Sequence, residues 1–543
     1  MRFRALVAFL LAIASFPSRA HARESFIEEV YVQHLPDDAV VVVFAFTRVL
    51  AETFNRRTSG ADALANALQK SNAVEIEVAF ARGRWRPRRW GRAPVVARAV
   101  GAEIAFAFER DDAETSLARA SALTTLGAMF CASLKSLTTS HAMVTQTLTQ
   151  SSRMSDASSA SDANATRTRA ALPHEAVCVE NLAPILSQLP CGARAGLGKS
   201  LKRARDAFAA SHLTLEARAT RTRSEIRVER TLMMVLPKSS DGLKGVLAII
   251  HDAGEASCVA SSKAYAHVRE AESVRTYDLS DAADVAALRE RTFEVVKQSP
   301  TMYVERFLTG TGNEFGGIVI DVERAEKNYT RYLPPCARVR LFQPLPWFVK
   351  LYMHTLVVEI NGVRVERDDR MVIEDTKFVP SEDRARSSVL EMQIMMSSSA
   401  STLRIRVDYD KGFLRAHEFP PDANRGFDLP PAELSVYAKG SWNPVKADVE
   451  TPLIAKLRAS PLEIVHMNPL LLLLPTPDFS MSFNVAALTG SVFSIIVVST
   501  IRTLTSRPDW RDYPKQKAAQ RRALASKAPS FIARALGKFA RAR

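Results

Sequence analysis

Apolar residues along most of the chain occur in short runs, many of them alternating with polar residues, and this pattern predicts β-strands. Residues 356–366 are the clearest case, because two such runs flank Asn361 and Gly362, a pair that favours the two-residue loop of a β-hairpin. The other predicted strands are residues 39–46 (AVVVVFAF), 75–80 (EIEVAF), 102–109 (AEIAFAFE), 224–236 and 403–409 (LRIRVDY).

Helical patterns are fewer, and we predict helices over residues 61–70, 114–137, 196–212 and 284–298. Because strands dominate and do not alternate regularly with helices, the expected fold class is mainly β (α+β). We expect stacked β-sandwich-like domains with helical additions and one C-terminal transmembrane helix. A chain of 543 residues is too long for a single core, so we expect an N-terminal β-rich domain at residues 23–215 and a second β-sandwich domain at residues 216–482.

The first 22 residues have the pattern of a secretory signal peptide. Arg2 and Arg4 precede a short apolar stretch, and the small-x-small sequence Ala20-His21-Ala22 provides a cleavage site. The alternative is a retained N-terminal membrane anchor. With the signal removed, the chain from about residue 23 onward enters the lumen of the secretory pathway.

Residues 483–501 are uncharged, mostly apolar and roughly long enough to cross a bilayer core once. The basic tail that follows, residues 502–543, holds twelve Lys and Arg against two Asp, a net charge of +10 out of +15 for the whole chain. Positive residues favour the cytosolic side of a membrane. The charge therefore indicates a single-pass protein with a lumenal body and a cytosolic tail, and it is weak evidence for nucleic-acid binding.

Within the predicted span, Ala486, Gly490 and Ser494 recur at intervals of four residues and share one helix face. A stripe of small residues allows another membrane helix to approach closely. We therefore expect this face to pack against a neighbouring helix.

The five cysteines are Cys131, Cys178, Cys191, Cys258 and Cys336. Disulfides are expected in an oxidising lumen, and an odd number leaves at least one thiol free or paired with another chain. None of the spacings suits a zinc site, so we expect no metal and no other cofactor.

Two sequons, at Asn164 and Asn328, are predicted N-glycosylation sites. Asn164 lies in a Ser/Thr/Ala-rich stretch that is expected to form an exposed loop.

Motifs for catalysis are incomplete. Residues 196–200 (GLGKS) resemble the end of a phosphate-binding loop, but Ala193 stands where the first glycine belongs, and we interpret the segment as a helix N-terminus. His174 lies four residues before Cys178 without a family-like catalytic signature around either. The residues therefore give no positive argument for an active site.

Several segments, in collinear order over nearly the full chain, resemble the PIG-T family, the large non-catalytic subunit of GPI transamidase. The most specific are LGAMFCASLKSL (residues 126–137), LPHEAVCVENLAPILSQLPCGARAGL (172–197) and LPTPDFSMSFNV (474–485). ESFIEEVYVQHLPDD (24–38), FARGRWRPRRWG (80–91), VERFLTGTG and LPWFVKLYMHTL complete the series. Residues 51–70 are shorter than is usual in the family, and residues 218–300 align poorly.

The resemblance implies a lumenal scaffold in the endoplasmic reticulum membrane. The complex replaces the C-terminal signal of a precursor protein with a preassembled GPI lipid. The caspase-like PIG-K subunit supplies the nucleophilic cysteine, and other membrane subunits complete the complex. The runner-up interpretation is a membrane-anchored lumenal hydrolase that acts alone.

The resemblance also implies that Cys178, in the family's Cys-x-Glu-Asn sequence, forms an interchain disulfide with the catalytic subunit. The alternative is an intrachain bond from Cys178 to Cys191 or Cys131. If Cys178 is interchain, Cys131 and Cys191 are the candidate intrachain pair. Cys258 and Cys336 match no assigned position in the family.

Trp85 and Trp90 lie among five arginines, a composition that also suits carbohydrate or phosphate binding. The family has the tryptophans but fewer arginines. We therefore interpret the two rings as a structural aromatic pair.

Overall fold

The computed structural model describes residues 24–51, 62–109, 113–138, 144–146, 166–202, 208–237, 258–271, 273–290, 294–310, 312, 314–325, 337–419, 425–438, 446–458, 463–476, 479–505 and 512–527. Residues up to Pro475 form one compact unit, and those from Thr476 form another. The predicted signal peptide, the sequons at Asn164 and Asn328, and Cys336 lie outside the described residues.

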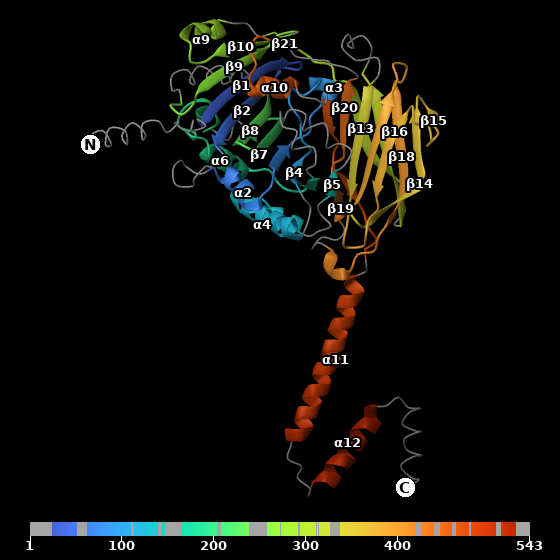
Figure 1. Cartoon of the computed structure of the whole chain (residues 1–543). Coiled ribbons are helices and arrows are strands. Elements are labelled where there is room, and N and C mark those ends of the chain that lie inside the picture. Colours follow the sequence, from blue (N-terminus) through green and yellow to red (C-terminus); the bar gives the residue numbers. More distant parts are fainter. Residues whose placement is uncertain are drawn as a thin grey trace, which may run out of the picture. The chain divides into compact units, whose positions relative to one another are not determined.

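The first half of the large unit is built on an 11-stranded sheet (Figure 1), with the strand order β21-β10-β9-β1-β2-β8-β7-β3-β4-β6-β5. The strands are β1 (Ser25–Leu35), β2 (Ala39–Ala51), β3 (Glu75–Arg82), β4 (Gly101–Phe108), β5 (Val144–Gln146), β6 (Thr166–Leu172), β7 (His212–Arg221), β8 (Glu225–Pro237), β9 (Lys263–Arg269), β10 (Ser273–Asp278) and β21 (Lys446–Ala447).

The central strands are apolar on both sides because both faces of the sheet are covered. In β2, Val42 and Phe44 belong to a core on one face, whereas Val41 and Val43 belong to a smaller core on the other. This explains why AVVVVFAF is a continuous apolar run, as expected for a strand buried on both faces.

Helices cover the larger core. They are α2 (Ala63–Ser71), α4 (Ala113–Phe130) and α6 (Val179–Ser187), with the short 3₁₀ segments η1 (Leu134–Thr138) and η5 (Leu197–Lys202). The Asp62 carboxylate caps α2 by accepting from Leu64 N and Ala65 N, and it also accepts from Arg230 at 2.6 Å. The smaller core lies under α3 (Pro87–Trp90) and α10 (Pro452–Arg458), and α9 (Ala282–Arg289) follows β10.

The second half is a β-sandwich of two five-stranded sheets around its own core, ordered β11-β12-β18-β14-β15 and β16-β17-β13-β20-β22. The first sheet has β11 (Met302–Thr309), β12 (Phe315–Arg324), β14 (Val349–Ile360), β15 (Val363–Val365) and β18 (Thr402–Lys411). The second has β13 (Ala337–Leu345), β16 (Ile373–Val379), β17 (Ser388–Met396), β20 (Glu433–Ala438) and β22 (Glu463–His466). The elements β19 (Phe427–Leu429) and β23 (Leu470–Leu472) pair separately, and η7 spans Ala416–Glu418.

The predicted hairpin is confirmed, because β14 and β15 pair directly across Asn361 and Gly362. Both loop residues have positive φ, 51° and 77°, as the twisted two-residue turn requires. The mainly β class and the single C-terminal apolar helix are also confirmed.

The boundary expected at residues 215 and 216 is wrong, because both residues lie inside β7, in the middle of the large sheet. The change from sheet to sandwich falls between α9 and β11 instead. The strand β21 and helix α10 then return from the later sequence to the first sheet. Pairing between such distant segments leaves no mark in local sequence.

Buried charges join the large sheet to the sandwich. Glu103 on β4 accepts from Arg98 at 3.4 Å and lies 3.4 Å from Nδ1 of His466 on β22. Arg169 on β6 pairs with Glu433 on β20. Ion pairs removed from water need good geometry to be stable, so this network constrains how the two halves pack.

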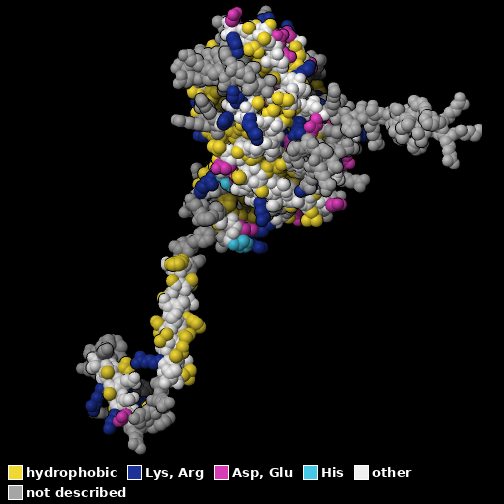
Figure 2. All heavy atoms as spheres, turned by 90° about the vertical axis from the view of Figure 1, so that its left-hand side faces the viewer, with side chains coloured by type: hydrophobic (Ala, Val, Ile, Leu, Met, Phe, Trp, Pro, Cys, Tyr) yellow, Lys and Arg dark blue, Asp and Glu magenta, His cyan; other side chains and the backbone are white. Residues whose placement is uncertain are grey.

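The second unit contains α11 (Phe479–Thr505) and α12 (Tyr513–Lys527). Its residues 483–505 are long and apolar enough to cross a membrane, with a mean hydropathy of 1.8. Hydrophobic side chains lie exposed along α11 (Figure 2), including Leu488, Phe493 and Ile495.

Candidate functional site

Cys178 is the N-cap residue of α6, in the helical layer that covers the large sheet. Its backbone N–H donates to Asn181 Oδ1 at 2.7 Å, and Asn181 Nδ2 donates to the carbonyl oxygen of Phe130 at the end of α4, also at 2.7 Å. Asn181 is fully buried, whereas Cys178 is half-buried. The helix layer thus holds the Cys178 backbone in place and leaves its side chain partly accessible.

The electrostatics around this thiol oppose its ionisation. A hydrogen bond with the Glu180 carboxylate is the main cause that raises the pKa of the Cys178 thiol. The same bond lowers the pKa of the Glu180 carboxyl. The N-terminus of a helix ordinarily lowers a thiol pKa and activates it as a nucleophile. Here the hydrogen bond with Glu180 outweighs that effect, and the net shift of the thiol pKa is upward.

The contacts of His174 are with a different residue from those of Cys178. Its Nδ1 lies 3.6 Å from Asp428 Oδ2, and the thiol's side-chain hydrogen-bond partner is Glu180. Nucleophilic catalysis by Cys needs a base within hydrogen-bond reach or a lowered thiol pKa. The contacts described for the two side chains are with Asp428 and Glu180.

A second free thiol, Cys131, follows α4 directly and is exposed. It has φ of 49°, a left-handed conformation, where the chain leaves the helix. Two residues later, Ser133 N donates to Glu175 Oε1 at 3.0 Å, which ties the segment after α4 to the segment before α6. Cys131 and Cys178 therefore belong to neighbouring segments of the same helical layer.

The candidate pairing of Cys131 with Cys191 is corrected, because Cys191 forms a disulfide with Cys258. Their Cα atoms are 5.8 Å apart, within the range for a disulfide. Cys258 is buried in the large core, with Cys191 packed against it. The sequence separation of 67 residues and the intervening strands β7 and β8 hid this partner from sequence reasoning. Cys178 remains unpaired within the described chain.

The GLGKS segment holds no external anion site. Its residues from Leu197 on form η5, and backbone N–H groups of Leu197 and Gly198 donate to the chain's own Glu28 carboxylate. Gly196 has φ of 65°, and a Cβ there would collide with the Glu28 carboxylate. Burial raises the pKa of Glu28 to about 7. The loop therefore cradles an internal acid.

Trp85 and Trp90 form the aromatic pair expected from the sequence. Their rings are 5.2 Å apart and edge-on, and Trp85 Nε1 donates to Gly91 O at 2.9 Å. Trp90 is buried in the smaller core. The surrounding arginines have separate partners, such as Glu323 for Arg88. The motif is built into the fold.

Ala486, Gly490 and Ser494 all lie on α11, and the Ser494 hydroxyl donates to Gly490 O at 2.8 Å. Among the described residues no group of three or more His, Cys, Asp or Glu could hold a metal ion.

The chain matches the model of the family described as "Gpi16 subunit, GPI transamidase component", over residues 8–248 and 244–531. It is 25% identical over 92% of its length to the GPI transamidase component PIG-T homolog of Schizosaccharomyces pombe, covering 94% of that protein. It is 26% identical to the human GPI-anchor transamidase component PIGT, over 92% of this chain and 93% of the human one. The GPI transamidase component GPI16 of Saccharomyces cerevisiae is 23% identical, with 86% of each chain covered. With both halves of the fold and the segment around Cys178 inside the matched residues, the chain belongs to the Gpi16 family of GPI transamidase components.

Proposed function

We propose that this chain is a non-catalytic scaffold subunit of a GPI transamidase in the endoplasmic reticulum membrane. Family membership over nearly the full length carries the proposal, because the relatives in fission yeast, budding yeast and human are named as components of that enzyme. The raised pKa of the Cys178 thiol, caused by its hydrogen bond with Glu180, supports a role for this residue outside the chemical step.

In this proposal Cys178 forms a disulfide with the catalytic, PIG-K-like subunit. Three properties support that role: the side chain is partly accessible, it has no disulfide partner in the described chain, and its backbone is fixed by buried Asn181. Next to it, Val179 is an apolar side chain with 50% of its surface exposed, which suits a protein contact. A bond formed from this position would hold a partner against a rigid helix layer.

The proposed topology places residues 23–482 in the lumen and residues 502–543 in the cytosol. The apolar helix followed by Arg502 supports a single crossing, and the basic tail supports its orientation. Glycans on Asn164 and Asn328 belong to the same proposal. The small-residue face of α11, with Ala486, Gly490 and Ser494, would contact the membrane helices of other subunits.

The test is to deplete this chain from its own cells and follow one GPI-anchored reporter. Precursor that retains its C-terminal signal should accumulate, and re-expressed wild-type chain should restore its processing. Purified full-length chain should leave the precursor uncut on its own. If the purified chain cleaves the precursor, and Cys178→Ala abolishes that cleavage, the membrane-anchored hydrolase is the correct function.

A further inference from the structure

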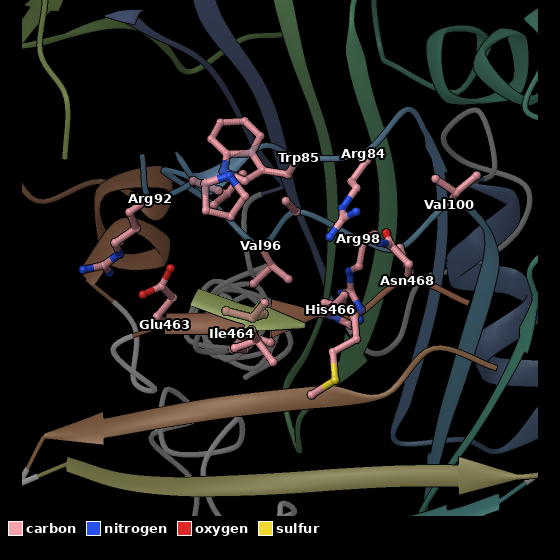
Figure 3. A pocket seen from close by; sticks show the side chains of 18 of the residues that line it. Arg84, Trp85, Arg92, Val96, Arg98, Val100, Glu463, Ile464, His466 and Asn468 are labelled. Carbon is pink, nitrogen blue, oxygen red and sulfur yellow. The ribbon is translucent and has the colours of Figure 1, made fainter. Parts of the chain in front are cut away.

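A cavity of about 530 Å³ lies where the large sheet meets the sandwich (Figure 3). One wall is the segment that follows α3, residues 92–100, and the opposite wall comes from β11 and residues 463–470. The volume falls in the range of ligand sites in proteins, about 300–1,000 Å³. Cys178 is not among the residues that line the cavity.

The charges on the cavity wall do not balance. Six Arg and Lys line the cavity, against four Glu, and Arg218 has a further acid partner, Glu75, outside the lining. Two of the acids are already neutralised, since Glu77 pairs with Arg98, and Glu216 pairs with both Arg98 and Lys456. A third, Glu463, accepts from Thr301 N at 2.6 Å and lies near Arg92 at one end of the cavity.

Arg306 on β11 is a buried cation of this wall without an acid partner among the described residues. Only 9% of its surface is exposed, and among the described residues no carboxylate pairs with it. Its Nη1 donates to Gln343 Oε1 at 3.1 Å and its Nη2 to Pro430 O at 3.0 Å, while Nε is buried without a hydrogen-bond partner. Burial lowers the pKa of Arg306 to about 9, so the guanidinium is still charged at neutral pH.

Burying a charge without a counter-ion is unfavourable, because the charge loses its hydration without gaining a partner. A guanidinium is also the side chain best suited to carboxylate and phosphate, because its planar array of N–H donors matches their oxygens. An anion that entered the cavity would supply the missing negative charge beside a buried cation of its lining.

The remaining wall is partly apolar. Val96 and Ile464 lie between the Arg92–Glu463 end of the cavity and the end formed by Arg98 and His466 (Figure 3). An inorganic ion would leave these side chains uncovered, whereas an anion with a carbon skeleton would cover them.

We propose that this cavity binds a small organic anion, whose phosphate or carboxylate group pairs with Arg306 and whose apolar part lies against Val96 and Ile464. The ligand is a soluble metabolite or the headgroup of a lipid, and the experiment separates the two sources.

The experiment follows thermal unfolding of the full-length chain in detergent at constant ionic strength. The salts compared are chloride, phosphate, phenyl phosphate and benzoate. A ligand that binds only the folded state raises the melting temperature. We expect phenyl phosphate or benzoate to raise it above chloride, at an at least tenfold lower concentration than inorganic phosphate requires.

Arg306→Met should abolish this increment, and Arg306→Lys, which keeps the charge but not the planar donors, should weaken binding about tenfold. Arg275→Met removes an exposed arginine on β10 and should retain the full increment. Comparing each variant with and without anion separates binding from any change in stability caused by the substitution. General stabilisation by salt would raise the melting temperature of all variants equally.

The source of the ligand is tested by equilibrium dialysis with glycerol 3-phosphate and by binding to nanodiscs with and without phosphatidic acid. Binding of glycerol 3-phosphate at one site per chain, lost in Arg306→Met, indicates a soluble ligand. Arg306-dependent binding to phosphatidic acid alone indicates a lipid headgroup. The proposal is overturned if no anion shifts the wild-type melting temperature, or if Arg306→Met responds like wild type.

Discussion

Removing the Cys191–Cys258 disulfide should destabilise the large core by about 4 kcal/mol. The bond closes a loop of 67 residues that contains the adjacent strands β7 and β8. In the chain-entropy treatment, a loop of that length contributes about 4 kcal/mol by restricting the unfolded state. The bond also ties the segment after α6 to the residues just before β9, so its loss leaves both held only by packing.

The assay is urea unfolding of the full-length chain in detergent, followed by tryptophan fluorescence, for the double variant Cys191→Ala, Cys258→Ala. Cys131→Ala is the matched control, because it removes an exposed thiol outside the bond and should change stability by less than about 0.5 kcal/mol. Peptide mapping without reductant should recover the Cys191–Cys258 linkage. A double variant within about 1 kcal/mol of wild type, or a mapped Cys131–Cys191 bond, would refute the pairing.

Three further substitutions test other parts of the structure. Glu28→Gln should remove a pH dependence of stability. Because burial raises the Glu28 pKa to about 7, the stability of the wild type falls as the pH rises from 4.5 through 7. In a urea titration at pH 8, the variant should therefore be more stable than the wild type by up to about 3 kcal/mol. Glu103→Gln should act in the opposite direction. Burial alone would raise the Glu103 pKa, but His466 and the neighbouring arginines outweigh it and lower the pKa to about 2, so wild type loses stability as the pH falls from 4.5 toward 2. At pH 7 the Glu103→Gln variant should have a free energy of unfolding about 3 kcal/mol lower than the wild type, and its stability should depend less on acid. Equal midpoints of acid unfolding for the two proteins would contradict this. Gly490→Leu should reduce the recovery of membrane partners in co-purification, because it fills the small-residue face of α11, whereas Ala487→Leu, off that face, should not.

Features set by neighbouring residues were predictable from the sequence. Asn361-Gly362 specifies its turn through backbone conformations that few other pairs adopt, and AVVVVFAF specifies a strand by its continuous apolar character. The apolar segment from residue 483 specifies a helix long enough to span a membrane.

Features that depend on distant residues were not predictable. The boundary at 215 was wrong because β7 pairs with β3 on one side and β8 on the other, and no local break in pattern marks where the sheet ends. The partner of Cys191 lies two strands further along the chain. The GLGKS loop looked like an anion site because its backbone does cradle a carboxylate, but the carboxylate comes from Glu28, about 170 residues earlier.

The measurement that tests the central claim most directly is electrophoresis of native-cell membranes with and without reductant, for wild type, Cys178→Ser and Cys131→Ser. The scaffold proposal predicts a larger species in wild type and Cys131→Ser that collapses on reduction and contains a cysteine-protease-like subunit by mass spectrometry. That species should be missing from Cys178→Ser. A wild-type chain that runs as a monomer without reductant would contradict the covalent link, and a larger species that survives Cys178→Ser would move the link to another cysteine.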